Sequence, residues 1–326
     1  MPITTPKEMF ARAYKEGYAI GAFNVNNMEI IQGIMQAGAE ERSPLILQVS
    51  AGARKYAGQV YIMKLVEAAL AESDIPVVVH LDHGPDFELC KACIDGGFSS
   101  VMIDGSHLPF EENIAVTNQI LSVARPLGIS VEAELGKIGG TEDNVTVSER
   151  EATFTDPAEA EYFVQQTGIR SLAVAIGTAH GQYKGEPKLD FERLSQIKER
   201  VQIPLVLHGS SGVPDEALRE AVKRGVRKIN IDTNLREAFT DGVREVLAKS
   251  QMRSTRARSS AQPVKKWQNA SPKRSASSAP TAKREEATEK WKEISLLNLP
   301  ASRRLQRSTA PNGSAAWRKI LPTAQP

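Results

Sequence analysis

The sequence predicts an α/β protein built as a closed (β/α)8 barrel, with a short amino-terminal helix and an atypical basic carboxyl-terminal tail. Eight short runs rich in Val, Ile and Leu each precede a segment with helical periodicity. Such units with right-handed crossovers form either a closed barrel or a doubly wound sheet. Polar residues stand at the ends of several strands, and this spread favours the barrel, because a doubly wound sheet concentrates its site at one switch point.

The predicted elements alternate regularly along the first 250 residues. The strand segments are YAIGAFNV (18–25), PLILQVS (44–50), PVVVHLDH (76–83), SVMIDGS (100–106), SVEAELG (130–136), SLAVAIG (171–177), PLVLHGSS (204–211) and KINIDT (228–233). The helical patterns that follow them cover 27–42, 58–73, 86–96, 109–125, 156–168, 190–201, 214–225 and 235–249. Asn26, Asp190 and the Val213-Pro214-Asp215 step occupy cap or first-turn positions, and Gly96, Gly168 and Gly225 end other helices.

Composition describes a soluble globular protein, since 41% of the 326 residues are apolar and 25% are charged. The segment MPITTPKEMFARAYKEG has no apolar core and is predicted as a polar helix capped by Thr5, so no secretory signal is expected. No apolar run is long enough to span a bilayer. Cys90 and Cys93 form a lone C-x-x-C, which predicts buried free thiols in a reducing compartment. The expected location is therefore cytoplasmic.

Charge divides the chain into two parts, although its net charge is only +2. Residues 251–326 contain 16 Lys and Arg against 4 Asp and Glu, whereas residues 1–250 contain 25 against 35. We predict a barrel domain at 1–250 and a low-complexity tail at 251–326 that is either disordered or out of frame. The alternative of an inactive barrel with a nucleic-acid-binding tail is disfavoured, because no nucleic-acid-binding module is recognisable.

Three histidines stand at or just beyond predicted strand ends, each beside a glycine. His83 lies in HLDHG after the third strand, His180 in GTAHG after the sixth, and His208 in LVLHG on the seventh. A closed barrel brings these strand ends around one mouth. Three neutral imidazoles with an open fourth position form a catalytic zinc site, so we predict zinc there. His80 and His107 are expected to be structural.

Two loops have the features of phosphate sites. GSSGVP (209–214) and NIDTN (230–234) each lead into a helix amino terminus, where backbone N–H groups and the helix dipole favour anions. A further anion site is predicted in HGQYKGEP, where Gly181 permits close backbone approach and Lys184 can neutralise charge.

The loop after the fifth predicted strand, ELGKIGGTEDN (134–144), is rich in glycine. It lacks the Lys-Ser/Thr pair of a Walker A motif, so a nucleotide cradle is not expected. We predict a mobile lid that carries Glu142 and Asp143.

Seven segments then carry a family resemblance: GAFNVNN, HLDHG, VMIDGSHLPFEEN, VEAELGKIGG, AIGTAHGQYKGEPKLDF, PLVLHGSSGVP and KINIDTNLR. In order and spacing they resemble the class II zinc-dependent ketose-bisphosphate aldolases over residues 1–250. The resemblance implies a TIM barrel that cleaves fructose 1,6-bisphosphate reversibly to dihydroxyacetone phosphate and glyceraldehyde 3-phosphate. Tagatose 1,6-bisphosphate, which differs only at C4, stays open as the alternative substrate. A homodimer or homotetramer is also implied if the altered tail permits one.

The resemblance further implies roles for individual residues. His83, His180 and His208 hold the zinc; Asp82 handles the C4 hydroxyl proton, and Glu142 is the base at the dihydroxyacetone phosphate carbon. Asp104 and Glu134 correspond to an alternative or second metal position. Substrate phosphate and a monovalent cation, Na⁺ or K⁺, are held by Gly181, Lys184, Gly209, Ser211, Asn230, Asp232 and Thr233, with Asn24 and Ser50 also near the substrate.

The implied chemistry explains these residue types. Cleavage leaves negative charge on the triose enolate, which zinc stabilises as a Lewis acid, so no lysine Schiff base is required. Zinc amidohydrolases also place histidines around a barrel mouth, but they need a His-x-His pair on the first strand and GAFNVNN has none. After residue 250 the chain departs from the family, because an Asp-Pro-Arg-containing segment is missing, and this departure bears on both activity and assembly.

Overall fold

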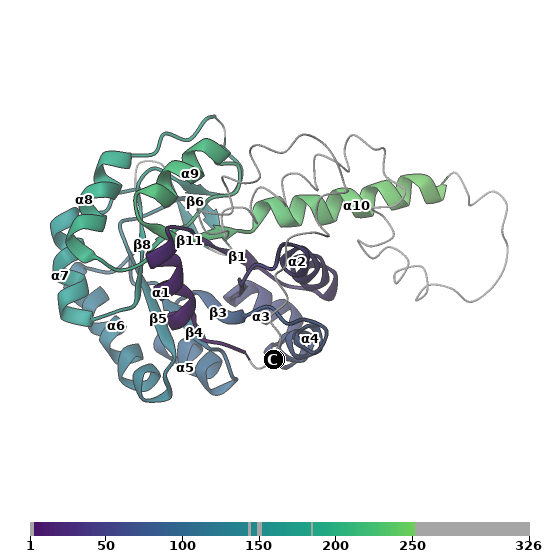
Figure 1. Cartoon of the computed structure of the whole chain (residues 1–326), viewed down its shortest axis with the longest axis horizontal. Coiled ribbons are helices and arrows are strands. Elements are labelled where there is room, and N and C mark those ends of the chain that lie inside the picture. Colours follow the sequence, from purple (N-terminus) through teal and green to yellow (C-terminus); the bar gives the residue numbers. More distant parts are fainter. Residues whose placement is uncertain (1–2, 143–144, 149–151, 184, 252–326) are drawn as a thin grey trace, which may run out of the picture.

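The structure is a computed structural model that describes residues 3–142, 145–148, 152–183 and 185–251. Within these residues, eight parallel strands close into a barrel in the order β1-β11-β10-β8-β5-β4-β3-β2. Helices surround the barrel, as Figure 1 shows, and the predicted (β/α)8 architecture is confirmed. The tail predicted at 251–326 lies outside the described residues from position 252 onward.

The barrel strands are β1 (Ile20–Asn24), β2 (Leu45–Ser50), β3 (Val77–Gly84), β4 (Ser100–Ile103), β5 (Ser130–Leu135), β8 (Ser171–Val174), β10 (Leu205–Leu207) and β11 (Val226–Ile231). The helices are α1 (Pro6–Glu16), α2 (Met28–Glu41), α3 (Ala51–Ala57), α4 (Gln59–Ala71), α5 (Phe87–Asp95), α6 (Phe110–Ala124), α7 (Pro157–Thr167), α8 (Phe191–Val201), α9 (Asp215–Lys223) and α10 (Thr233–Gln251), with a short 3₁₀ turn η1 (Arg125–Leu127). Strands buried along both faces explain the apolar runs in the sequence.

Several predicted strands end earlier than expected, and for β8 and β10 backbone geometry explains why. Strand β8 ends at Val174 and β10 at Leu207, whereas the sequence predicted ends at 177 and 211. Gly177 and Gly209 have φ of 109° and 59°, which turn the chain out of the extended conformation. The predicted strands therefore included the first residues of the loops that form the barrel mouth.

The helix caps follow the predictions except in α1, α2 and α9, and in α9 Arg224 is the carboxyl-terminal cap residue in place of the predicted Gly225. Helix α2 is capped by Asn27, whose side chain accepts a hydrogen bond from the Ile30 N–H at 2.9 Å, and not by the predicted Asn26. Asp190 caps α8 as predicted. Thr5 occupies the cap position of α1 but makes no side-chain capping hydrogen bond there. Helix α3 was not predicted, because only Ala53 of its seven residues is buried and it has no apolar stripe.

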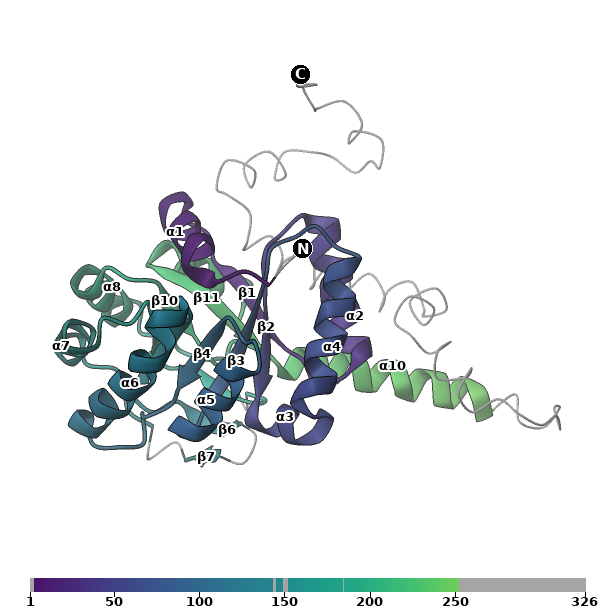
Figure 2. The same cartoon turned by 90° about the horizontal axis from the view of Figure 1, so that it is seen from below.

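Two hydrophobic clusters divide the interior. The larger one lies between the strands and the surrounding helices, and it includes the buried thiols of Cys90 and Cys93. The smaller one joins α1 to inward-facing residues of β1, β2 and β3, namely Ile20, Ala22, Ile46 and Val78. Figure 2 shows α1 at one end of the barrel and strands β6 and β7 at the other. Helix α1 therefore closes the end of the barrel opposite the predicted site.

A small second sheet lies at that other end. It contains β6 (Gly139–Glu142), β7 (Val145–Val147) and β9 (Ala179–His180), in the order β7-β6-β9. Strand β6 comes from the predicted lid segment and pairs in parallel with β9, which places Gly140 opposite His180. The predicted lid is thus attached by backbone hydrogen bonds to the segment that carries His180.

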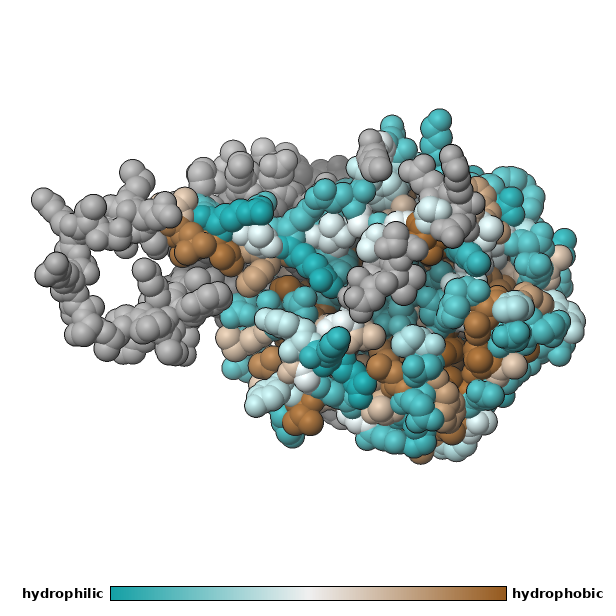
Figure 3. Space-filling view, turned by 180° about the vertical axis from the view of Figure 1, so that it is seen from behind, coloured by the Kyte–Doolittle hydropathy of each residue, from teal (hydrophilic) through white to brown (hydrophobic). Residues whose placement is uncertain are grey.

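The molecular surface combines polar and apolar areas. Figure 3 shows hydrophilic residues interspersed with hydrophobic ones on the face seen from behind. Helix α10 projects beyond the barrel in Figures 1 and 2, and Leu247 near its end is 60% exposed. Among the described residues, no helix has the length and apolar character needed to cross a membrane.

Gly140 is a position in the small sheet where the packing leaves no room for a side chain. Its φ is 105°, and a Cβ there would lie 2.1 Å from the carbonyl oxygen of His180. We expect Gly140→Ala to destabilise the protein by about 1–3 kcal/mol, because the strained backbone and the clash both oppose the native pairing. Urea unfolding measures this change, and a zinc titration reports whether His180 is displaced.

The control is Gly33→Ala in the middle of α2, where an added Cβ has open space and φ is ordinary. It should stabilise the protein by about 0.5–1 kcal/mol, because alanine loses less conformational freedom in a helix. Equal stability of the two variants would contradict the proposed constraint at Gly140.

Candidate active site

The three predicted histidines meet at the mouth of the barrel. His83 lies near the end of β3, His180 on β9, and His208 directly after β10. Their ring centroids are 4.7 Å apart for His83 and His208, 5.2 Å for His83 and His180, and 5.9 Å for His180 and His208. One ligand atom from each lies within 4.8 Å of the other two.

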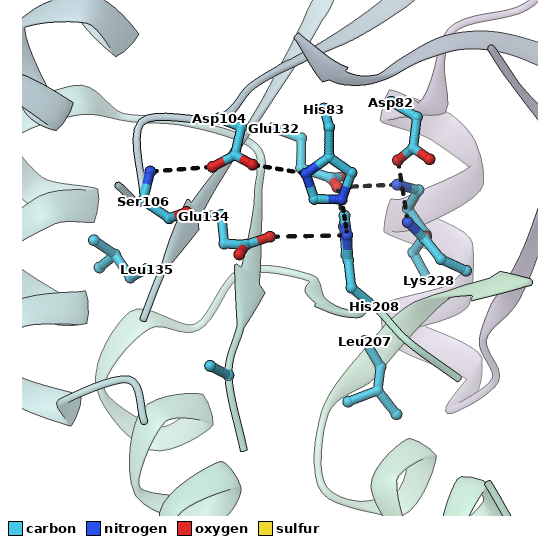
Figure 4. Close-up of polar contacts among 12 residues, drawn as sticks. Asp82, His83, Asp104, Ser106, Glu132, Glu134, Leu135, Leu207, His208 and Lys228 are labelled. Carbon is cyan, nitrogen blue, oxygen red and sulfur yellow. Dashed lines mark hydrogen bonds and ion pairs between the residues drawn. The ribbon is translucent and has the colours of Figure 1, made fainter. Parts of the chain in front are cut away.

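The donor set fits a single zinc ion. His208 Nδ1 and His83 Nε2 are 2.8 Å apart, so both rings direct a nitrogen at the same small space (Figure 4). Burial lowers the pKa of His208 to about 4, although the hydrogen bond to Glu132 acts in the opposite direction. A neutral imidazole is the form that binds a metal, so this ring is in the binding form at neutral pH.

His83 is held in an unusual backbone conformation by its surroundings. Its φ is 46°, in the left-handed region that non-glycine residues rarely adopt. Its Nδ1 lies 2.7 Å from Asp104 Oδ2, and the Ser106 N–H donates to the other Asp104 oxygen at 3.1 Å. This carboxylate fixes the orientation of the His83 ring and leaves Nε2 directed toward His208.

The two carboxylates predicted as a second metal position lie beside the histidines. Asp104 and Glu134 form a further group with His83 whose ligand atoms lie within 4.8 Å of one another. Glu134 Oε2 is 3.8 Å from His208 Nδ1. Burial raises the pKa of Asp104, but the contacts with His83 and Ser106 outweigh it and hold that pKa well below its usual range.

Asp82 is fully buried and held by two asparagines. Asn24 Nδ2 donates to one carboxylate oxygen at 2.8 Å, and Asn230 Nδ2 donates to the other at 3.3 Å. Gln48 Nε2 in turn donates to Asn24 Oδ1 at 2.9 Å, which leaves the amide group of Asn24 to face Asp82. The carboxylate therefore has a fixed orientation immediately before the His83 position in the chain.

A polar cavity of about 330 Å³ opens beside these residues. Its lining includes the predicted substrate residues Asn24, Gly181, Gly209, Ser211, Asn230, Asp232 and Thr233, together with His180. Thr141, Ser210 and Arg236 also line it and were not predicted. The amino terminus of α10 begins at Thr233, so backbone N–H groups favour an anion at this cavity.

Ser50 is a predicted substrate residue that does not line the cavity, and two further predicted residues lie wholly or partly outside the described structure. Ser50 lies opposite Asp82 in the register of β2 and β3, and its hydroxyl accepts from the Ala53 N–H at 3.1 Å to cap α3. Lys184 lies outside the described residues, and the side chain of Glu142 is likewise not described although its backbone ends β6.

Arg236 and Tyr183 are site residues that the sequence analysis missed. Arg236 lies on the first turns of α10, and its Nε is 2.7 Å from Asp232 Oδ1. Its position after the predicted phosphate loop was the available signal. Tyr183 receives a hydrogen bond from the Ala179 N–H at 2.8 Å and donates one to Gly209 O at 2.7 Å, so it ties the His180 segment to the His208 segment.

A buried ionic cluster beneath the histidines was also missed. Lys228 Nζ is 2.9 Å from Glu132 Oε1 and 3.3 Å from His80 Nε2. His80 Nδ1 lies 2.8 Å from Ser100 Oγ, in keeping with the structural role expected for His80. These contacts join β3, β5 and β11, which are not neighbours in the sheet, so they cross the barrel interior.

Comparison with known proteins identifies the family. The family model for fructose-bisphosphate aldolase class-II matches residues 4–292. The chain belongs to the class-II fructose-bisphosphate aldolase family. This aldolase is therefore a lyase of a zinc-dependent family that acts on phosphorylated sugars. The family match continues 42 residues beyond the domain boundary predicted at 250.

Individual relatives agree with the family match. The aldolase is 48% identical over 236 residues to a fructose-bisphosphate aldolase of Staphylococcus aureus strain Mu50, covering 72% of this chain and 82% of that protein. It is 49% identical over the same length to one from Geobacillus stearothermophilus. Among solved structures, the YdjI aldolase of Escherichia coli K12 matches with a TM-score of 0.72 and 34% identity, covering 90% of this chain and 97% of that one.

His80 generates a prediction about stability and pH for the metal-free aldolase. Burial lowers the pKa of His80 well below its ordinary 6.5, and the charge of Lys228 lowers it further. Below pH 6.5 the unfolded chain binds a proton at His80 that the folded protein does not. The free energy of unfolding should therefore fall as pH decreases below 6.5, by about 1.4 kcal/mol per pH unit for this residue.

Urea unfolding with chelator present, at pH 7.5, 6.5 and 5.5, measures how steeply the free energy of unfolding depends on pH. His80→Gln should reduce this pH dependence by the amount that corresponds to one bound proton. The control variant His107→Gln, which changes an exposed histidine, should leave the pH dependence unaltered. His208, with its pKa lowered to about 4, also makes the free energy of unfolding fall within this window, and it is unchanged in both variants. Asp104 and Glu132 have lowered pKa values and affect the free energy of unfolding only as pH falls below about 4.5, outside this window. An unchanged slope in the His80 variant would show that His80 takes up its proton in the folded state.

Proposed function

We propose that this aldolase cleaves fructose 1,6-bisphosphate reversibly to dihydroxyacetone phosphate and glyceraldehyde 3-phosphate, with zinc bound by His83, His180 and His208. The observation that carries the proposal is the meeting of three imidazoles next to the fully buried Asp82 and a polar cavity. The relatives named fructose-bisphosphate aldolase support the choice of sugar.

The chain's own residues account for binding and proton transfer. A bound zinc ion supplies Lewis-acid stabilisation for the negative charge that develops on the triose. Asp82 accepts the proton of the C4 hydroxyl as the C3–C4 bond breaks, so that C4 becomes an aldehyde and the electron pair stays on C3. Asn24 and Asn230 hold the two carboxylate oxygens in place for this transfer.

The departing triose must then gain a proton at C3. We assign this transfer to Glu142, whose backbone lies at the end of β6. Because β6 pairs with β9, the Glu142 segment and the His180 segment are linked at the same mouth. In the condensation direction the same two carboxylates exchange roles, as microscopic reversibility requires.

Phosphate binding is assigned to the cavity. The Ser211 hydroxyl accepts from the backbone N–H groups of Asp232 and Asn234 at 3.3 and 3.4 Å, which holds the two phosphate loops together. The guanidinium of Arg236 supplies positive charge at the lining. Lys184, which lies outside the described residues, is assigned to the same phosphate from its place in the HGQYKGEP segment. A monovalent cation, Na⁺ or K⁺, is proposed beside the phosphate, where Asp232 offers a carboxylate.

Assembly and location complete the proposal. We assign the catalytic domain to residues 1–250, the tail to 251–326, and the enzyme to the cytoplasm as a homodimer or homotetramer.

The test of the function is chelator-sensitive cleavage of both ketose bisphosphates by the full-length protein. Activity should disappear with chelator and return with zinc, and kcat/KM should be higher for fructose 1,6-bisphosphate than for tagatose 1,6-bisphosphate. Activity that survives complete metal removal would overturn the mechanism. A higher value for the tagatose sugar would overturn only the substrate assignment.

Asp82 provides the second functional test. Asp82→Asn keeps the shape of the side chain but removes the proton acceptor, so kcat should fall by about 10²- to 10⁴-fold with zinc content unchanged. Steady-state kinetics and metal analysis of the purified variant measure both quantities. Turnover at the wild-type rate would show that another group takes the C4 hydroxyl proton.

A further inference from the structure

The ionic cluster under the histidines has contacts that reach the proposed metal site. Glu132 Oε1 lies 2.9 Å from Lys228 Nζ and 3.1 Å from His208 Nε2. Figure 4 shows the carboxylate of Glu132 and the side chain of Lys228 beside His208. All three side chains are buried, with Lys228 and His208 at 0% exposure and Glu132 at 1%. The contact chain therefore runs from Lys228 through Glu132 to His208 inside the barrel.

Burial of this ion pair calls for a physical reason. Removing a carboxylate and an ammonium group from water costs several kcal/mol for each ion, and an apolar pair of similar volume is often as stable or more stable. Stability alone therefore does not account for Glu132 and Lys228 in the middle of the barrel. The contact with His208 gives the pair a specific task.

That task follows from the hydrogen bonding of a neutral imidazole, which has one N–H and one lone pair. The Glu132 carboxylate only accepts hydrogen bonds, so the ring proton of His208 lies on Nε2. The lone pair of His208 is consequently on Nδ1, which faces His83 Nε2 at 2.8 Å. A lone pair directed at that space is what a shared metal ion requires.

Lys228 holds the carboxylate in the position that this arrangement needs. Its ammonium group donates to the same oxygen, Glu132 Oε1, and also lies 3.3 Å from His80 Nε2. The Ser171 hydroxyl donates to the other oxygen, Oε2, at a longer 3.4 Å. The lysine thus neutralises the buried carboxylate and orients the oxygen that contacts His208.

We propose that Glu132 and Lys228 are positioning residues that fix the tautomer and orientation of His208 for metal binding. This inference rests on the proposed zinc site and assigns it a supporting layer across the barrel from β5 and β11. Neither residue touches the substrate in this assignment; both act through His208.

The decisive variant is the double substitution Glu132→Gln with Lys228→Met in the full-length chain. It removes both charges together, so no unpaired ion is left buried and the metal-free fold should keep a similar unfolding midpoint. The glutamine amide can donate to His208 Nε2 and move the ring proton to Nδ1. Zinc affinity, measured by competition with a chelator of known affinity, should fall about 10- to 100-fold.

Ser171→Ala is the matched control. It removes the hydrogen bond to Glu132 Oε2 but leaves the contacts of Oε1 with His208 and Lys228 in place. Zinc affinity of this variant should stay within about threefold of the wild type. A double variant that folds and binds zinc as tightly as the wild type would overturn the positioning role.

A measurement on the wild type keeps the test decisive even if the double variant does not fold. Nitrogen chemical shifts of ¹⁵N-labelled histidine in the metal-free protein distinguish the two tautomers, and a His208→Gln spectrum assigns the ring. The proton should be found on Nε2, and a proton on Nδ1 would overturn the inference. Failure of the wild type to bind zinc would instead refute the proposed function.

Discussion

Closure of the parallel barrel is the constraint on which the rest of the structure depends. It brings the end of β3 and the end of β10 to one mouth, so His83 and His208 lie 2.8 Å apart although they are 125 residues apart in sequence. Because the strands are parallel, every strand end with a polar residue faces the same opening. Two of the three histidines and the buried Asp82 carboxylate can then share that opening directly from the strand ends.

The third histidine depends on a different interaction. His180 lies on β9, which pairs with β6 of the small sheet, and the hydroxyl of Tyr183 bridges Ala179 and Gly209. His180 is therefore positioned by contacts between loop segments and not by the barrel ladder. The same β6 ends at Glu142, so the segment proposed to carry the second proton-transfer group is coupled by backbone hydrogen bonds to a proposed zinc ligand.

The sequence predicted the barrel and the meeting of the histidines because both leave local signals: apolar runs buried on two faces, and polar residues where those runs end. Tyr183 and the strands of the small sheet leave no such signal, since their pairing is tertiary and the strands are short. Glu132 did leave one. It alternates with Glu134 along β5, and this period of two places both carboxylates on the inner face, but only Glu134 stood near the strand end.

The barrel interior is apolar at one end and carries charged residues toward the other, where the site lies. Helix α1 seals one end with the apolar cluster that includes Ile20 and Ala22. Above it lies the Glu132–Lys228 pair, and above that pair lies His208 at the mouth. Because α1 keeps water from entering below, the charges act in a medium of low dielectric constant, where their attraction is stronger than it would be in water. The amino-terminal helix thus contributes to the orientation of a histidine at the opposite end of the barrel.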